Sequence, residues 1–181
     1  MGLSGDLYSG KQIHTTFDRS ARRPILAYAS AAIGVLHDPG SGRQTFLNGH
    51  TDDISCIAMS GDGKILATGQ VGRPAFVHVW DLHSVTTAKN PNDNPLFVPK
   101  AQVTSSNDGP APASDSPAYL CTIGGDHGYS PGFFQRGVCA IELSPTGRYV
   151  VAVGCDDKHR MGIWDITRGG ALIADTVTQN G

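Results

Sequence analysis

A three-strand pattern that ends in Trp-Asp occurs twice in this chain and restricts the fold more than any other feature of the sequence. In each copy, two runs of mostly apolar residues flank a turn rich in Ser, Gly or Pro, and a third run leads to the Trp-Asp pair. Such runs are typical of antiparallel hairpins, and their repetition predicts several small sheets of the same build. The runs are residues 54–59, 64–69 and 76–81 in the first copy and residues 138–143, 148–154 and 161–166 in the second.

A Gly-His pair, Gly49-His50, stands just before the first copy. Gly-His, three strands and Trp-Asp within about 40–45 residues form the signature of a WD-repeat propeller blade. In such a blade the histidine, a Ser or Thr, a turn Asp and the tryptophan can form one hydrogen-bonded network, although residues 70–74 of the first copy contain no Asp. The predicted network residues are His50, Thr68 and Trp80 in the first copy, and Asp156 or Asp157 with Trp164 and His127 in the second.

The two tryptophans, Trp80 and Trp164, are 84 positions apart, about twice the length of one repeat. Six of the 11 prolines lie between residues 84 and 118, which leaves no apolar alternation of strand length there. We therefore interpret residues 84–118 as a long insertion, largely disordered from about Thr104 to Ser116, rather than as a hidden blade. The fourth strand of this blade is then predicted at residues 118–123, and a smaller insertion at residues 128–136.

These patterns divide the chain into four segments. We predict a flexible N-terminal arm over residues 1–23, a partial blade over 24–48, a blade over 49–127 and another over 128–181. The predicted fold class is all-β, a partial WD-repeat β-propeller with about two complete four-stranded blades plus part of a preceding blade. Because a propeller needs at least four blades to close its ring, we expect the chain to be a fragment of a longer propeller whose remaining blades come from the same chain.

Charge and apolar content argue against several classes of partner. The chain has 14 Lys and Arg against 16 Asp and Glu, so its net charge of −2 does not favour nucleic-acid binding. No apolar run approaches the ~18 residues of a membrane-spanning helix, and we identify no signal peptide. The single cysteines lack C-x-x-C spacing, and we interpret all four as buried, reduced thiols of a cytosolic protein: Cys56, Cys121, Cys139 and Cys155.

The sequence predicts no catalytic residue, no metal site and no cofactor, and therefore no enzyme. The glycine-rich residues 124–128 lack the Lys-Ser/Thr of a phosphate-binding loop, and no G-x-S-x-G motif occurs. Asp126-His127 with Cys121 and Cys139 has irregular spacing for a zinc site. The Asp pairs at residues 52–53 and 156–157 are explained by hydrogen bonding within turns.

Two stretches resemble the echinoderm microtubule-associated protein-like (EML) family. They are residues 48–54, 67–74 and 77–81, which include GHTDD and ATGQVG, and residues 137–140 with 153–159. The resemblance runs from about Pro24 to Ala174. It implies a propeller scaffold that binds tubulin, microtubules or axonemal proteins, located in the cytoplasm on the cytoskeleton or in the axoneme of a cilium or flagellum. The alternative is a general WD-repeat adaptor in a cytosolic complex unrelated to microtubules.

Two groups of side chains are candidate partner contacts. Phe133 and Phe134 are adjacent aromatic residues in a Gly- and Pro-rich loop, where they either pack under the loop or anchor a partner. Arg22 and Arg23 belong to a basic cluster that is either solvated or able to contact the acidic surface of tubulin.

Overall fold

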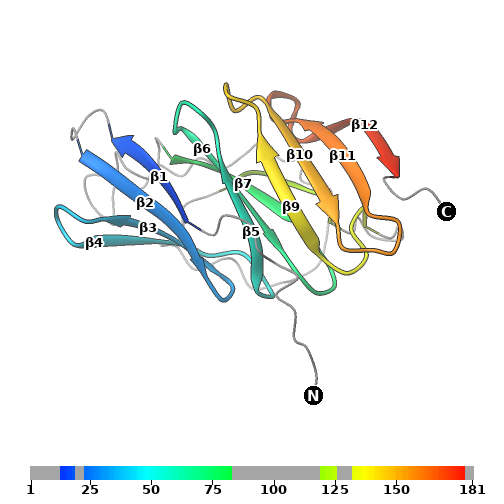
Figure 1. Cartoon of the computed structure of the whole chain (residues 1–181), viewed down its shortest axis with the longest axis horizontal. Helices are drawn as coiled ribbons and strands as arrows, with labels where there is room; N and C mark the ends of the chain where they lie inside the picture. The colour runs from blue at the N-terminus through cyan, green and yellow to red at the C-terminus, as the bar shows by residue number, and fades with distance from the viewer. Residues whose placement is uncertain (1–12, 19–22, 83–118, 126–131, 178–181) are drawn as a thin grey trace, which may run out of the picture.

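Twelve β-strands form three four-stranded antiparallel sheets in the computed structural model, which describes residues 13–18, 23–82, 119–125 and 132–177 (Figure 1). Within each sheet, the strands pair in the order in which they occur along the chain. A short 3-10 helix, η1 (Ile166–Arg168), joins the last two strands. Within the described ranges, no helix has the length and apolar character needed to cross a membrane.

The strands of each sheet are joined by short connections, apart from the long segment between the third and fourth strands of the second sheet. The first sheet contains β1 (Ile13–Asp18), β2 (Arg23–Ser30), β3 (Ile33–Asp38) and β4 (Arg43–Leu47). The second sheet contains β5 (Ile54–Met59), β6 (Ile65–Gln70), β7 (Val77–Asp81) and β8 (Tyr119–Ile123). The third sheet contains β9 (Val138–Leu143), β10 (Tyr149–Gly154), β11 (Arg160–Asp165) and β12 (Ala171–Val177).

The all-β prediction is confirmed, but the first sheet is more complete than the sequence suggested. Its first strand, β1, pairs with β2 over Ile13↔Tyr28 to Asp18↔Arg23. The prediction of an N-terminal arm is therefore wrong for Ile13–Asp18, and the first sheet has four strands rather than part of a blade. The sequence of β1 shows no strong apolar alternation, and its pairing with the edge of β2 defines it as a strand. The remainder of the arm, residues 1–12 and 19–22, lies outside the described residues, as do the segment 83–118 and residues 128–131 of the smaller insertion.

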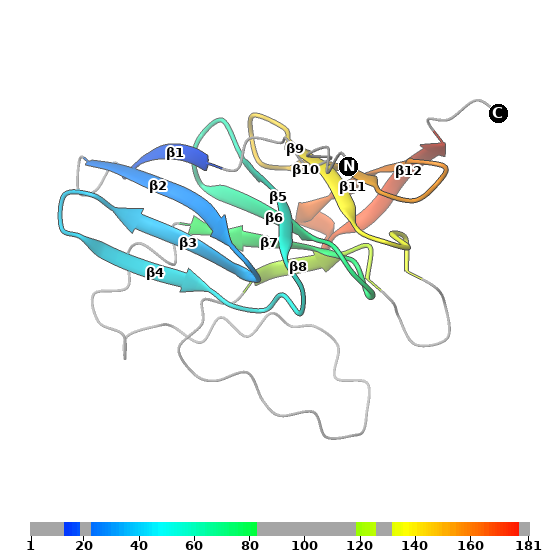
Figure 2. The same ribbon diagram turned by 60° about the horizontal axis from the view of Figure 1, so that its bottom comes forward.

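The three sheets lie side by side in chain order, and their first strands approach one another: β5 contacts β9 on one side and β1 and β2 on the other (Figure 2). One apolar cluster fills the space between the first and second sheets and includes Leu36, Leu47, Leu66 and Trp80. A second cluster lies between the second and third sheets, where Val79 and Trp164 are among its buried members.

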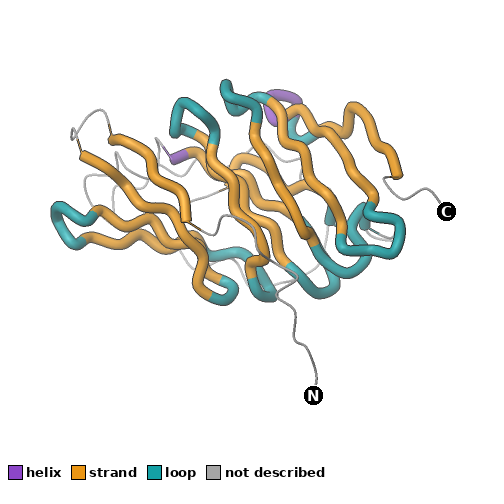
Figure 3. The backbone as a smooth tube through the Cα atoms, viewed as in Figure 1, coloured by secondary structure: helices purple, strands orange, loops and turns teal. Residues whose placement is uncertain are grey.

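The middle position of the second sheet explains its unusual burial pattern. Five of the six residues of β5 and of β6 are buried, with no alternation between buried and exposed positions. In β10, by contrast, buried residues alternate with partly exposed ones. A strand with apolar cover on both faces buries successive side chains, whereas a strand with cover on one face buries every second one. The loops gather at the two ends of these packed strands (Figure 3).

Candidate protein-binding site

Side-chain hydrogen bonds join His50, Thr68 and Trp80 within the second sheet. His50 precedes β5, and its Nε2 atom lies 2.7 Å from Oγ1 of Thr68 in β6. The indole Nε1 of Trp80 in β7 donates to the same oxygen at 2.8 Å. Thr68 and Trp80 are fully buried. Side chains therefore connect the loop before β5 to β6 and β7, in addition to the backbone pairing of the strands.

Gln70, which the sequence analysis did not select, extends this network at the end of β6. Its Oε1 atom lies 2.8 Å from Nδ1 of His50 and accepts a hydrogen bond from the backbone N–H of Thr51 at 3.1 Å. Its Nε2 atom donates to the carbonyl of Pro74 at 2.7 Å and to Oγ1 of Thr51 at 3.0 Å. The signal in the sequence is a polar residue between Gly69 and Val71, at the start of the segment 70–74 that contains no Asp.

The partners of Gln70 define the proton positions in the network. The Pro74 carbonyl can only accept, so the amide nitrogen of Gln70 faces it and the amide oxygen faces His50. The Nδ1 atom of His50 then carries the ring proton, and Nε2 accepts from the Thr68 hydroxyl. Burial lowers the pKa of His50 to about 4, although the hydrogen bond that the ring donates to Gln70 acts in the opposite direction. The imidazole of His50 is therefore neutral at neutral pH. Each polar group of this hydrogen-bonded network has a partner.

A second histidine that the sequence analysis missed, His78, anchors the loop before β5. Its Nε2 atom lies 3.3 Å from the carbonyl oxygen of Gly49, and its Nδ1 atom lies 2.8 Å from Oγ1 of Thr122. The ring stacks on Tyr119 with 4.1 Å between centroids. Gly49 has a φ of 151°, and a Cβ atom there would lie 3.2 Å from Nε2 of His78, so the Gly-His pair requires its glycine. Burial, followed by the nearby His50, lowers the pKa of His78 to about 3.

The residues predicted to form a network in the third sheet are not joined to one another within the described part of the chain. Asp156 is buried and accepts hydrogen bonds from the backbone N–H groups of Lys158 and Arg160, both at 3.2 Å. It therefore closes the turn between β10 and β11. Trp164 lies in the apolar cluster between the second and third sheets. The other predicted member, His127, lies outside the described residues.

Phe133 and Phe134 pack beneath their loop, which is the first of the two alternatives that the sequence left open. Phe134 is buried, and Phe133 is partly buried against the same apolar cluster. The rings of Phe133 and Phe134 lie 4.9 Å and 5.7 Å from that of Trp164, and the guanidinium of Arg160 covers Phe133 at 4.2 Å. The loop folds back because this aromatic cluster fills the space beside the third sheet. Arg22 lies outside the described residues, and Arg23 is described only as the first backbone position of β2.

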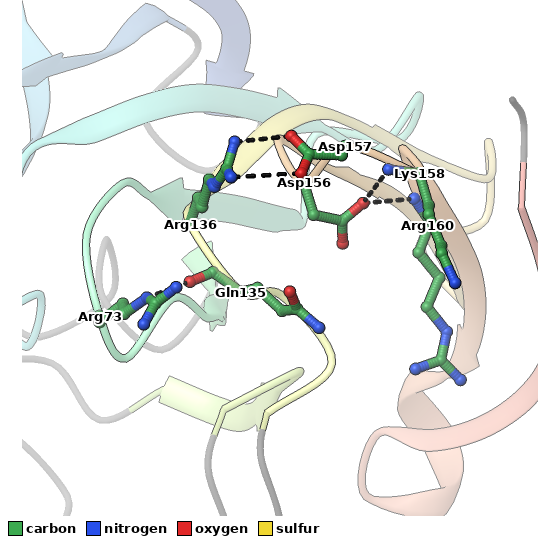
Figure 4. Close-up of polar contacts among 7 residues, drawn as sticks. All are labelled: Arg73, Gln135, Arg136, Asp156, Asp157, Lys158 and Arg160. Atoms are coloured by element: carbon green, nitrogen blue, oxygen red, sulfur yellow. Dashed lines mark hydrogen bonds and ion pairs between the residues drawn. The ribbon is translucent and has the colours of Figure 1, made fainter.

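Exposed charged side chains gather at one end of the second and third sheets, on loops that hydrogen bonds connect to one another (Figure 4). The backbone N–H of Gly72 donates to the carbonyl of Arg136 at 3.0 Å, and Nε of Arg73 donates to that of Gln135 at 2.8 Å. Arg136 forms a two-pronged ion pair with Asp157, whose shorter contact is 2.8 Å. We call this surface the loop face; it consists of residues 48–53, 71–76, 132–137 and 155–159.

The loop face presents charges of both signs. Arg73 and Lys158 are exposed, and no carboxylate pairs with either within the described residues. Asp52 and Asp53 are exposed beside them. Asp52 lies directly over Gly72, where a Cβ atom would be only 2.0 Å from its Oδ2 atom. In the parts of the chain that the structure describes, no cluster of three or more His, Cys, Asp or Glu residues is suited to hold a metal ion. The arrangement therefore suits recognition of another macromolecule by paired charges.

The strand order, the buried His-Thr-Trp network and the loop face define a group of WD-repeat propeller blades. Residues 41–81 match the sequence model of the family described as WD domain, G-beta repeat. The chain therefore contains a WD repeat at these residues.

Three relatives identify the kinds of WD-repeat protein that it resembles. It is 41% identical to cilia- and flagella-associated protein 52 of Chlamydomonas reinhardtii over 159 residues, which cover 86% of this chain and 19% of the relative. It is 25% identical to human echinoderm microtubule-associated protein-like 2 over 150 residues, 77% of this chain and 17% of the relative. It is 29% identical to human echinoderm microtubule-associated protein-like 3 over 161 residues, 80% and 14% respectively. The resemblance to EML proteins is confirmed, and the chain spans less than a fifth of the length of these relatives.

Proposed function

We propose that this chain is part of a non-catalytic scaffold that binds tubulin, microtubules or axonemal proteins through the loop face. The observation that carries the proposal is the set of exposed, cross-connected charged loops on a WD-repeat sheet pair, in a chain similar to proteins named for microtubules and for cilia and flagella. We assign it to the cytoskeleton, in cytoplasmic microtubule arrays or in an axoneme.

The buried network supports the loop face mechanically. His50 and Gln70 lie at the bases of two of its loops, and Gln70 holds the backbone of the β6–β7 loop through Pro74. Binding residues on loops are effective when a rigid scaffold holds them in place, because less conformational entropy is then lost on binding. A scaffold of this kind keeps Arg73 in a constant position relative to the third sheet, where it contacts Gln135.

The charges of the loop face supply the recognition. Arg73 and Lys158 are long, exposed cations, and the acidic surface of tubulin offers carboxylates to pair with them. Binding of this kind is weakened by salt, because exposed charges are screened over about 8–10 Å at physiological ionic strength. The exposed Asp52 and Asp53 also suit a partner of mixed charge, which favours an axonemal protein or another cytosolic protein as the alternative partner.

The test is microtubule co-sedimentation of the complete protein that contains this chain. The double variant Arg73→Glu with Lys158→Glu reverses two exposed cations of the loop face. The matched control, Arg43→Glu with Arg168→Glu, makes the same charge change at exposed positions near the opposite ends of the strands. We expect the first variant to pellet at least about tenfold more weakly than the wild type and the control to pellet like the wild type.

The outcomes separate the proposals. A wild-type protein that does not pellet above background overturns tubulin binding, and capture of tubulin-free complexes from ciliated cells then favours the adaptor alternative. If both double variants lose microtubule pelleting to the same extent, the assignment of binding to the loop face is overturned.

A further inference from the structure

Two cysteines meet at the edge of the third sheet that faces the second. Cys139 is in β9, at a bulge where the pairing with β10 shifts between Val153 and Gly154. Its sulfur lies 3.4 Å from the carbonyl oxygen of Val153 and 3.5 Å from that of Gly154, the residue before Cys155. The Cys155 sulfur lies 3.5 Å from the place that a Cβ atom on Gly137, two positions before Cys139, would occupy. The bulge thus places the Cys139 side chain beside the backbone that leads from the end of β10 into Cys155.

This pair differs from the other two cysteines in exposure and acidity. Cys56 and Cys121 are buried, and burial raises their thiol pKa values to about 12 and about 11. Cys139 and Cys155 are partly exposed, so the prediction that all four thiols are buried is wrong for these two.

The acidity of Cys139 has identifiable causes. The hydrogen bond from Cys155 and the nearby His159 lower the pKa of the Cys139 thiol to about 7, against opposing effects of partial burial and of Asp156. A substantial fraction of Cys139 is therefore thiolate at neutral pH, and the thiolate is the reactive form.

We propose that Cys139 and Cys155 form an oxidisable thiol pair, which a peroxide converts into an intramolecular disulfide. The Cys139 thiolate attacks one oxygen of hydrogen peroxide, the O–O bond breaks, and Cys139 becomes a sulfenic acid with release of hydroxide, which takes up a proton to form water. The Cys155 sulfur then attacks the sulfenic sulfur, loses its proton and forms the S–S bond, with release of a second water. Two thiols and one peroxide thus give one disulfide and two waters.

The position of the pair connects its oxidation to the junction of the second and third sheets. Val138, next to Cys139, accepts hydrogen bonds through its carbonyl from the Ser55 hydroxyl and the Cys56 thiol of β5. Gly137 forms a bridge with Val71, and its carbonyl accepts from the N–H of Cys155 at 2.9 Å. A disulfide would tie the start of β9, which directly follows loop-face residues 132–137, to the β10–β11 turn, which belongs to the loop face.

The test is treatment of the whole chain with hydrogen peroxide, followed by blocking of free thiols and peptide mapping by mass spectrometry. We expect a loss of two hydrogen atoms from the intact mass, a peptide pair linked through Cys139 and Cys155, and continued labelling of Cys56 and Cys121 only after denaturation. These readouts come from the wild-type protein, so they do not depend on how a variant folds. A link between any other pair of cysteines, or two free thiols at Cys139 and Cys155 after treatment, overturns the proposal.

Two variants test the order of the steps. Cys155→Ser removes the resolving thiol, and we expect the sulfenic acid on Cys139 to persist and react with dimedone. Cys121→Ser, the matched control at a buried cysteine, retains the Cys139–Cys155 link. Dimedone labelling of Cys155 before Cys139 in the wild type contradicts the assigned roles.

Discussion

The side-chain oxygen of Gln70 lies 2.8 Å from Nδ1 of His50, at the place where the WD pattern leads one to expect a carboxylate. An amide at this place accepts the same hydrogen bond but carries no charge. Gln70 consequently supplies no anion to stabilise the protonated form of His50, and burial keeps the pKa of this histidine low. The network therefore meets its hydrogen-bonding needs without a buried ion pair, whose desolvation is costly.

Replacement of Gln70 tests this arrangement. Gln70→Ala leaves Nδ1 of His50, the N–H of Thr51 and the carbonyl of Pro74 without their partner, so we expect the free energy of unfolding to fall by about 2–4 kcal/mol. The control is Gln44→Ala, at an exposed position of β4, with an expected change within about 0.5 kcal/mol. Urea unfolding measures both, and equal losses in the two variants contradict the role of Gln70.

The hydroxyl of Thr68 serves both His50 and Trp80, and two substitutions separate its polarity from its volume. Thr68→Val preserves the shape but removes the hydroxyl, which leaves Nε1 of Trp80 without an acceptor and Nε2 of His50 without a donor. We expect a loss of about 1–3 kcal/mol in the free energy of unfolding. Thr68→Ser retains the hydroxyl and leaves a methyl-sized gap, for which we expect a loss of about 1 kcal/mol. If the valine variant is as stable as the wild type in thermal unfolding, the shared hydroxyl has no energetic role.

The lowered pKa values of His50 and His78 make stability depend on pH. In the unfolded chain both histidines take up protons below their ordinary value of 6.5, whereas in the folded chain they do so only near 4 and 3. The free energy of unfolding therefore decreases as pH falls from 6.5 toward 4, with a slope approaching about 1.4 kcal/mol per pH unit for each histidine.

The measurement is urea unfolding at about pH 7 and about pH 5, within the range where these two histidines differ between the folded and unfolded states. His159→Asn, at an exposed histidine with a φ of 45°, is the control, since Asn tolerates this left-handed conformation. We expect the control to keep the full pH dependence. A wild-type stability that is unchanged between these two pH values would show that the buried histidines take up protons in the folded state.

Gly69 controls how closely the second and third sheets approach. A Cβ atom on Gly69 would lie 2.9 Å from Cβ of Val138, 2.7 Å from Cδ1 of Ile141 and 3.0 Å from Sγ of Cys56. The Ile141 tip can move, but Val138 is stiff and its strand would have to shift. We expect Gly69→Ala to lower the free energy of unfolding by about 1–3 kcal/mol through overpacking.

The control for this substitution is Gly125→Ala, whose Cβ would have ordinary contact with Phe76 at 3.4 Å, with an expected change within about 0.5 kcal/mol. Both are measured by thermal unfolding. Similar stability for the two alanine variants would mean that the sheets can separate at Gly69 without cost.

Local patterns were enough to predict most strands, because β-branched runs and Gly- or Pro-rich turns act over a few residues. They also identified His50, Thr68 and Trp80, which the structure joins by hydrogen bonds. Neither β1 nor His78 had a comparable local signal, because β1 depends on the edge of β2 and His78 depends on the fold of a loop that is remote in sequence.

The orientation of the Phe133–Phe134 loop could not be predicted for a similar reason. Its Gly- and Pro-rich composition is compatible with an exposed loop. The rings turn inward because Gly162 has no side chain and leaves space for them. A Cβ atom on Gly162 would lie only 2.4 Å from the Trp164 ring and 2.9 Å from that of Phe133. This space exists only after β11 has joined its sheet, so it is a property of the tertiary fold.

The short connection between the first two sheets is held at both of its ends. Leu47, the last residue of β4, is fully buried between these sheets, and His50, three positions later, is bonded into the second sheet. A pulling force applied across this junction cannot peel the sheets apart by extending a slack linker, because the first displacement already breaks the buried bonds of His50. Under mechanical load, the first two sheets should therefore unfold together, as one force-bearing unit.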